Sequence, residues 1–192
     1  MRQPARRGAG FSLVELMVTI AVLAILLAIG IPSFASLIAA NRLTSATNEL
    51  VAALQTARTE ALRRNARVTL CPAAPSATAC SGAWRDGWIA FVDQTPGNTP
   101  GPESAADILF RGGPLPTGIV AVANAPLSSY VSFTADGMSK QLNGAFLAGT
   151  LRVCSTSTAL TNDRRARELV LIGSGRIVLT TPSGVASTCP SP

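Results

Sequence analysis

The stretch "GAGFSLVELMVTIAVLAILLAIGIP", residues 8–32, decides how this chain is organised. It opens an apolar run in which the 25 residues from Leu16 to Ala40 include no charged side chain. Because a helix rises ~1.5 Å per residue, this run is long enough to cross the ~30 Å hydrocarbon core of a bilayer. One carboxylate, Glu15, stands at its start, where an ordinary membrane anchor would carry no charge.

Basic residues precede the apolar run. Arg2, Arg6 and Arg7 lie before it, and positive charge beside a membrane-spanning helix favours the cytoplasmic side. We therefore expect a cytoplasmic N-terminus, a single pass through the membrane and a C-terminal part on its outer side. A cleaved secretory signal ending at Ala35 fits less well, since its hydrophobic region is normally about 7–15 residues long. A plain signal anchor explains the length and the orientation of the apolar run, but it does not explain the presence of Glu15.

Composition limits the chemistry of the remainder. The chain has 192 residues and no histidine, with 16 Lys+Arg against 10 Asp+Glu. The lack of histidine removes the commonest general base and the commonest metal ligand. The sequence also lacks a glycine-rich phosphate-binding loop. We therefore expect no catalytic residue, no cofactor and no metal site, and a signal-anchored periplasmic enzyme is only a distant alternative.

The cysteines predict two disulfide bonds. There are four, Cys71, Cys80, Cys154 and Cys189, and none forms a CxxC pair. An even number beyond a membrane segment is typical of an oxidising compartment. Three connectivities are possible. We favour Cys71–Cys80, which closes a short loop, together with Cys154–Cys189, which would fasten the C-terminal tail.

The hydrophobic pattern predicts an α+β fold. An apolar stripe at helical spacing continues to about Asn65, which predicts one helix from Phe11 whose second half, 41–65, is amphipathic. Turn signals at 136–137 and 173–175 lie between later segments, the second in a hairpin. We therefore expect one long helix packed against an antiparallel sheet. The segments with strand character are 67–72, 87–93, 106–111, 118–123, 130–134, 145–154, 167–173 and 175–180.

The N-terminal stretch resembles the class III signal of type IV pilins and pseudopilins. "RRGAG" matches the short basic leader, Gly10 the residue before the cleavage point, Phe11 the new N-terminus, and Glu15 the family's glutamate. The resemblance implies that prepilin peptidase removes residues 1–10 and that Phe11 is N-methylated. It also implies that Glu15 pairs with the N-terminal amine of an adjacent subunit as the helices stack, which fixes their registry.

The whole chain resembles a narrower group, the GspH/FimT family of minor pilins and pseudopilins. The order of "NELVAALQTARTEALRRNARVTLCP", "WRDGWIAFVD", "ILFR", "VSFTADG" and "ELVLIGSGRIVL" carries this resemblance. It implies a cleaved leader (1–10), a transmembrane and filament-core helix (11–40) and a head (41–192). The expected partners are prepilin peptidase, the inner membrane and other major or minor pilins or pseudopilins. We expect a FimT-type minor pilin of a type IV pilus; the alternative is a GspH-type pseudopilin of the type II protein secretion system.

Arginines near the C-terminus raise a further hypothesis, DNA binding by a receptor subunit of a competence pilus. Some FimT-like minor pilins bind DNA for uptake through a GRxR motif, and Val178 replaces its second arginine here. Arginine contacts to phosphate dominate non-specific DNA binding, so other arginines could supply the charge. A solvated loop and a protein-binding surface are the other readings of this cluster. The candidate residues are Arg152, Arg164, Arg165, Arg167 and Arg176.

Overall fold

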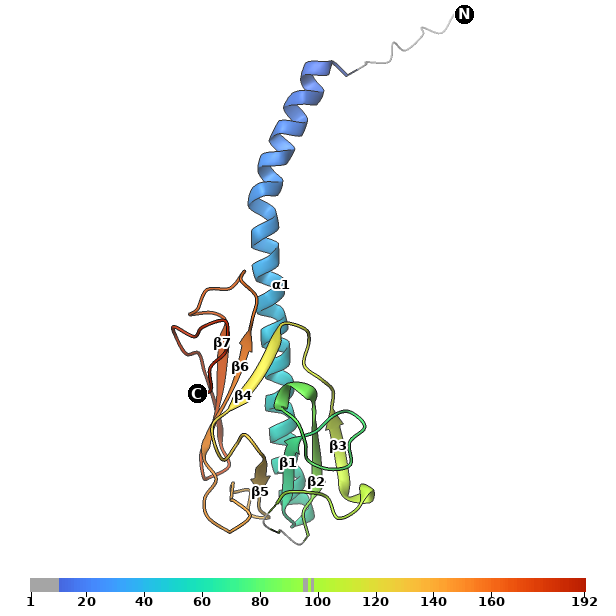
Figure 1. The fold of residues 1–192 in the computed structure, drawn as a ribbon, viewed down its shortest axis with the longest axis vertical. Helices are drawn as coiled ribbons and strands as arrows, with labels where there is room; N and C mark the ends of the chain where they lie inside the picture. Colours follow the sequence, from blue (N-terminus) through green and yellow to red (C-terminus); the bar gives the residue numbers. More distant parts are fainter. Residues whose placement is uncertain (1–10, 95–96, 98) are drawn as a thin grey trace, which may run out of the picture. The chain divides into compact units, whose positions relative to one another are not determined.

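The computed structural model describes residues 11–192 except 95–96 and 98. The chain forms two compact units, Met1–Leu37 and Ile38–Pro192. Figure 1 labels the helix α1 and the strands β1 to β7. In order along the chain, the elements are α1 (Leu13–Arg64), β1 (Val68–Pro72), the 3-10 helix η1 (Trp84–Asp86), β2 (Trp88–Val92), the 3-10 helix η2 (Ala105–Asp107), β3 (Ile108–Gly112), β4 (Ile119–Ala123), β5 (Val131–Phe133), β6 (Gly149–Ser155), β7 (Ala166–Leu171) and β8 (Ile177–Thr180).

The helix α1 ends at Arg64, because the next residue leaves the right-handed helical conformation. Asn65 adopts a φ of 50°, the left-handed conformation in which many helices terminate. The next amide, Ala66 N–H, turns back to donate to the Ala61 carbonyl at 3.2 Å. The predicted helix from Phe11 to Asn65 is therefore confirmed to within two residues at its start and one at its end.

The second half of α1 buries one face. Its buried members recur at helical spacing, as the sequence predicts, and the apolar ones from Leu43 to Ala61 pack into a core shared with strands of both sheets. Thr47, the polar member, donates its hydroxyl to the Leu43 carbonyl at 2.7 Å, so no polar group is left unsatisfied. The buried residues are Ala39, Leu43, Ala46, Thr47, Leu50, Ala53, Leu54, Ala57 and Ala61.

The strands form two antiparallel sheets instead of one. Sheet A has the order β3-β2-β1-β5, and sheet B has the order β4-β6-β7-β8. The division arises because the chain leaves sheet A after β3, forms β4, and returns so that β5 pairs with β1. In sheet B the opposed residues Leu151 and Leu169 are both buried in the shared core.

A buried serine links the two sheets. Ser139 forms an isolated bridge with Phe133 of β5, in sheet A. Its N–H donates to the Gly173 carbonyl at 3.1 Å, and its hydroxyl lies 2.7 Å from the Leu147 carbonyl oxygen and 2.9 Å from the Ile172 carbonyl oxygen. The segment after β5 is therefore fastened to the end of β7 in sheet B.

The predicted strands are confirmed with small shifts at most ends. The largest shift affects 145–154, where β6 begins only at Gly149. A Cβ at this position would lie 2.6 Å from Asn124 Oδ1, so the close approach of the neighbouring chain favours glycine here. Residue 106, predicted to start a strand, instead lies in η2.

Candidate assembly helix and arginine sites

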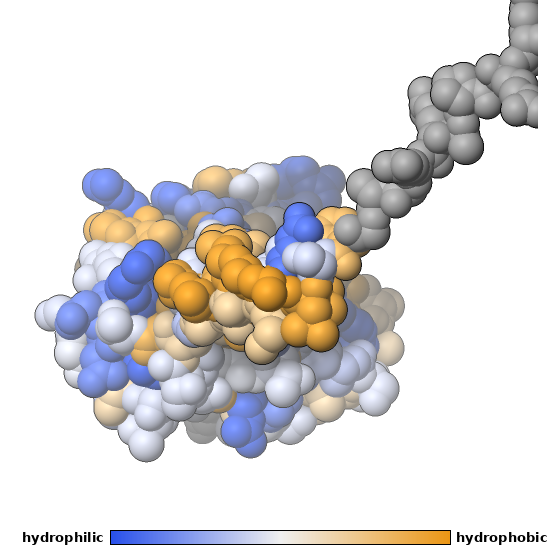
Figure 2. Space-filling view, turned by 90° about the horizontal axis from the view of Figure 1, so that it is seen from above, coloured by the Kyte–Doolittle hydropathy of each residue, from blue (hydrophilic) through white to orange (hydrophobic). Residues whose placement is uncertain are grey.

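The first half of α1 exposes its apolar side chains. Every large hydrophobic residue from Phe11 to Ile38 is at least 50% exposed. Figure 2 shows hydrophobic residues gathered on the face that is seen from above. Exposed apolar surface costs ~25 cal/mol per Å², and a continuous patch of this kind marks a site of contact with a membrane or a protein. Within the described residues, α1 is the one helix long and apolar enough to cross a membrane.

Glu15 lies in the first turn of this exposed helix. Ser12 caps the turn, because its hydroxyl accepts the Glu15 N–H at 3.2 Å and its carbonyl accepts the Leu16 N–H at 3.1 Å. We did not predict this cap, although the S-x-x-E spacing of "SLVE" is a known signal for it. The Glu15 carboxylate has no hydrogen bond or ion pair with any described residue.

The other predicted processing residues lie at or beyond the edge of the described chain. Phe11 is the first described residue, and it is 78% exposed. Gly10 and the rest of the leader, 1–10, lie outside the described residues.

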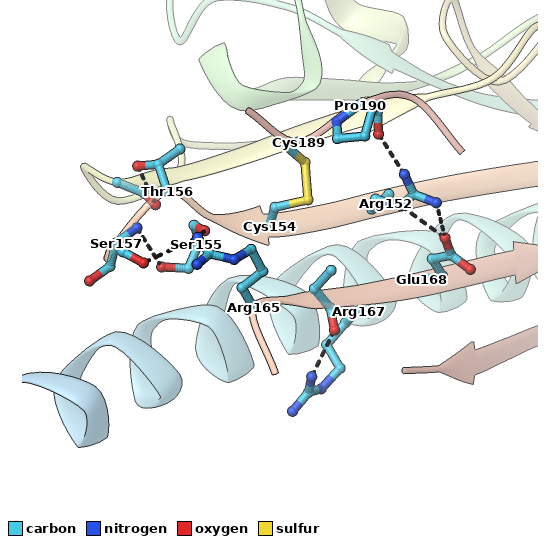
Figure 3. Close-up of a disulfide and its surroundings, with 12 residues drawn as sticks. Arg152, Cys154, Ser155, Thr156, Ser157, Arg165, Arg167, Glu168, Cys189 and Pro190 are labelled. Atoms are coloured by element: carbon cyan, nitrogen blue, oxygen red, sulfur yellow. Dashed lines mark hydrogen bonds and ion pairs between the residues drawn. A yellow bond between two sulfur atoms is a disulfide. The ribbon is translucent and has the colours of Figure 1, made fainter. Parts of the chain in front are cut away.

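Arg152, predicted as part of a basic surface, is engaged inside the head. Its Nε and Nη2 donate to Glu168 Oε1 at 2.8 and 2.6 Å, and its Nη1 donates to the Pro190 carbonyl at 2.6 Å (Figure 3). The two side chains of the ion pair are only 13% and 16% exposed. A cation already paired with a carboxylate offers little charge to a polyanion.

Arg165 is also turned inward. It is 5% exposed and donates to the carbonyls of Ser155 and Ser157 at 3.3 and 3.2 Å (Figure 3). It also donates to the carbonyl of Leu160. Its Nε is the one buried side-chain nitrogen or oxygen without a partner in the described part of the chain. Arg165 therefore holds the loop between β6 and β7 in shape.

The remaining candidates do not gather on one surface. Arg164 and Arg176 are exposed, whereas Arg167 is half-buried and donates to the Ala166 carbonyl at 2.7 Å. The six residues of β7, which span ~20 Å, separate Arg164 before the strand from Arg176, whose carbonyl accepts the Ile172 N–H beyond it. The structure thus does not bring the five predicted arginines together.

The turns at 136–137 and 173–175 both contact α1 through Arg58, a residue that we did not predict to have a role. Arg58 donates its Nε to the Gly137 carbonyl at 2.9 Å and its Nη2 to the Ser174 carbonyl at 3.2 Å. A Cβ on Gly175 would lie 2.0 Å from the Gly137 carbonyl oxygen, so the two turns require glycine where they touch. Hydrogen bonds from the Thr134 hydroxyl and the Met138 N–H lower the pKa of Asp136 in the first turn.

The structure contains the disulfides Cys71–Cys80 and Cys154–Cys189, with Cα–Cα distances of 5.5 and 5.9 Å. This is the connectivity that we favoured among three. The second bond fastens residues 181–192, which we name the C-terminal strap (Figure 3). Because side chains alternate along β6 and Val153 lies in the core with α1, Cys154 lies on the opposite face of sheet B, where it packs with Val185 and Cys189 of the strap.

Asp93, the residue after β2, is a buried carboxylate. It is 6% exposed, and its Oδ2 accepts a hydrogen bond from the Thr69 hydroxyl at 3.1 Å. Burial raises its pKa, an effect that the hydrogen bond and the charge of Arg67 only partly offset. Among the described residues, no group of three or more His, Cys, Asp or Glu side chains could hold a metal ion.

Comparison with known proteins identifies the family. The model of the family described as "Type II transport protein GspH" matches residues 46–175, more than half of the chain. The chain belongs to this GspH family. A second model, the prokaryotic N-terminal methylation motif, matches residues 5–31. No curated protein matches the sequence.

Solved structures share the fold of this GspH-family chain. The type IV minor pilin FimU of Pseudomonas aeruginosa, in space group P21, has a TM-score of 0.55 at 23% identity, covering 75% of this chain and 95% of that chain. The same protein in space group P65 has a TM-score of 0.52 at 21% identity, with coverages of 73% and 98%. At this identity the likeness shows the fold.

The family and fold together define the class of protein. GspH-family proteins are structural subunits and not enzymes, so this chain is a structural subunit of that family, and it shares its fold with a type IV minor pilin. Membership implies assembly with other pilins or pseudopilins. The apolar helix and the methylation motif are consistent with anchoring in a membrane before assembly.

Proposed function

We propose that this chain is a FimT-type minor pilin, which the membrane holds as a prepilin and which then enters a type IV pilus through the same helix. The observation that carries the proposal is the exposed apolar half of α1, in whose first turn the Glu15 carboxylate has no partner among the described residues. An apolar surface of this kind is stable where water is excluded, and the proposed life of the chain requires this both before and after assembly. Lipid supplies the first, and the helices of neighbouring subunits supply the second.

Processing creates the partner of Glu15. Cleavage after Gly10 by prepilin peptidase would leave an amine on Phe11, which is then methylated and remains cationic. A carboxylate inside a membrane costs up to ~3 kcal/mol at the centre and less near the interface, and a cationic partner offsets this cost. Pairing of Glu15 with the amine of an adjacent subunit would therefore favour one registry of the stacked helices over others.

The proposed topology follows from charge and cysteine chemistry. Arg2, Arg6 and Arg7 favour a cytoplasmic N-terminus, which places the head, 41–192, in the periplasm. Two disulfide bonds in the head suit an oxidising compartment.

A second candidate is a pseudopilin of the type II protein secretion system. The description of the matching family, a type II transport protein, supports this candidate, and the chemistry of α1 serves it equally well. DNA binding for uptake has weaker support, since Arg152 and Arg165 are engaged within the head and Arg164 is separated from Arg176 by β7. Neighbouring genes for other minor pilins, or for a secretion system, would distinguish the first two candidates.

The Glu15 carboxylate provides the test of assembly. We expect Glu15→Gln to lower the amount of the chain in sheared filaments about tenfold, equivalent to ~1.4 kcal/mol of assembly free energy, while its amount in the membrane stays unchanged. Glu49→Gln is the matched control, because Glu49 is an exposed glutamate on the same helix beyond the apolar half. Filament incorporation of Glu15→Gln at the wild-type level would contradict the proposal.

A further inference from the structure

We propose that the free edge of β4 binds an extended, uncharged segment of a partner protein as an added β-strand. The proposal concerns the head alone and is independent of how α1 assembles. It rests on the direction of the backbone hydrogen-bonding groups of β4, on their burial, and on the groove beside them.

The pairing of β4 with β6 determines which backbone groups point outward. Thr156 N–H donates to the Gly118 carbonyl at 2.9 Å, just before β4, and Asn124 N–H donates to the Thr150 carbonyl at 3.2 Å, just after it. The lateral direction of N–H and C=O alternates along an antiparallel strand. The even-numbered residues of β4 therefore face β6, and the odd-numbered residues face away from the sheet.

Two of these odd-numbered residues find no hydrogen-bond partner on the outward side among the described residues. Ile119 N–H is satisfied by the Pro116 carbonyl at 2.9 Å. Ala121 and Ala123 have no hydrogen-bond partner for their N–H and C=O groups in the described part of the chain. Ala121 is only 4% exposed, and an unsatisfied buried backbone group costs about 1–3 kcal/mol. A strand added at this edge would remove that cost.

A groove of about 270 Å³ lies beside this edge. η1 lies against β4 here, and Trp84 of η1 is held by a hydrogen bond from its indole Nε1 to the Leu127 carbonyl at 2.9 Å. The groove is slightly smaller than the ~300–1,000 Å³ usual for small-molecule sites. Its lining residues are small or apolar and none is charged: Gly82, Ala83, Trp84, Ala121, Val122, Ala123, Ser128 and Ser191.

These features specify the occupant. Ala121 and Ala123 each present one donor and one acceptor, ~7 Å apart along the edge, a pattern that another extended backbone complements. Because the lining carries no charge, an ionised side chain entering the groove would be buried unpaired at considerable cost. The occupant is therefore an extended segment with small, uncharged side chains, and the backbone provides most of the recognition.

The opposite edge of sheet B offers a matched control. The Ile172 N–H donates to the Arg176 carbonyl at 3.1 Å, so by the same alternation Ile177 and Leu179 of β8 point their backbone groups outward. Leu179 is 50% exposed, which lets water satisfy that edge. Proline at an outward position removes an N–H without breaking a bond to the neighbouring strand.

The test uses the full chain in detergent and a fluorescent, uncharged peptide of alternating serine and valine, with binding followed by anisotropy. We expect a Kd of about 1 mM or tighter. Ala121→Pro should weaken binding about tenfold or more, and Leu179→Pro should leave it within about twofold, differences of ~1.4 and ~0.4 kcal/mol. Absence of binding to the wild-type chain, or equal binding by both variants, would overturn the proposal.

A second arm keeps the test decisive if Ala121→Pro does not fold. Two peptides of the same sequence, N-methylated at alternate sets of residues, are compared on the wild-type chain. Pairing with one strand edge uses the amides of one set only. One peptide should therefore bind and the other should not; equal binding by both would contradict strand addition.

Discussion

The adjacent residues Arg164 and Arg165 have the same side chain but differ in exposure and in hydrogen bonding in the folded chain. Arg164 is exposed, whereas Arg165 donates to three carbonyl groups inside the head. We expect Arg165→Met to lower the free energy of unfolding by about 1–3 kcal/mol, since those carbonyls lose a charged donor. Arg164→Met should change it by less than ~0.5 kcal/mol. Denaturant unfolding of both variants in detergent measures the difference, and equal effects would contradict the assigned role of Arg165.

The raised pKa of Asp93 predicts that the stability of the fold depends on pH. Because burial raises its pKa in the folded chain, the folded state binds the proton more tightly than the unfolded state does. The free energy of unfolding therefore falls as the pH rises from below the ordinary value of 3.8 through the raised pKa. We expect Asp93→Asn, which keeps an acceptor for the Thr69 hydroxyl, to be more stable than the wild type at pH 7 and equally stable below pH ~3.8. A variant less stable than the wild type at pH 7 would refute this assignment.

What the sequence predicts about single residues depends on how local their surroundings are. Gly10, Phe11 and Glu15 form a signal within six consecutive positions, so their spacing alone indicates processing and assembly. The surroundings of Arg152 are not local, since its partners are Glu168 and Pro190, 16 and 38 positions away. Sequence spacing could not reveal that these contacts remove Arg152 from the predicted basic surface.

At the level of secondary structure, the sequence predicts which segments form helices and strands better than it predicts which strands pair. The helical stripe and the alternating segments predict α1 and the strands, because both periods are visible in a short window. Alternation does not say which strand lies beside which, so the division into sheets A and B was not predicted. The return of β5 to β1 depends on contacts between residues about 65 positions apart, such as the pair Val68 and Phe133.

The C-terminal strap leads to a prediction about its disulfide. Cys154–Cys189 closes a longer loop than Cys71–Cys80, with sequence separations of 35 and 9. In the chain-entropy account these loops correspond to about 4 and 2.5 kcal/mol of stabilisation. Replacing Cys154 and Cys189 by serine should therefore cost ~1 kcal/mol more in the free energy of unfolding than the same change at Cys71 and Cys80.

Thermal or denaturant unfolding of the two double variants makes this comparison, and each is the control for the other. Val185 packs beside Cys189 on the outer face of sheet B, so loss of the strap would also expose apolar surface there. A larger loss of stability from the Cys71 and Cys80 variant would show that the strap contributes less than proposed.

At the scale of the whole molecule, the two units of the chain differ in how far their apolar side chains are buried. The residues of α1 up to Leu37 have almost no buried side chains, whereas the unit from Ile38 contains a core formed by α1 and both sheets. Uniform hydrophobicity followed by an amphipathic pattern on one helix is enough to predict this contrast from sequence. It is also the reason that we assign assembly to the first part and specific contacts to the second.

The intact mass of the mature protein tests the central claim most directly. The chain is purified from cells with prepilin peptidase and, as a control, from cells without it. We predict that the mature protein lacks residues 1–10 and carries one added methyl group, and that the control keeps its leader. A mature protein that begins at Met1 or at Ser36 in cells containing the peptidase would contradict the account.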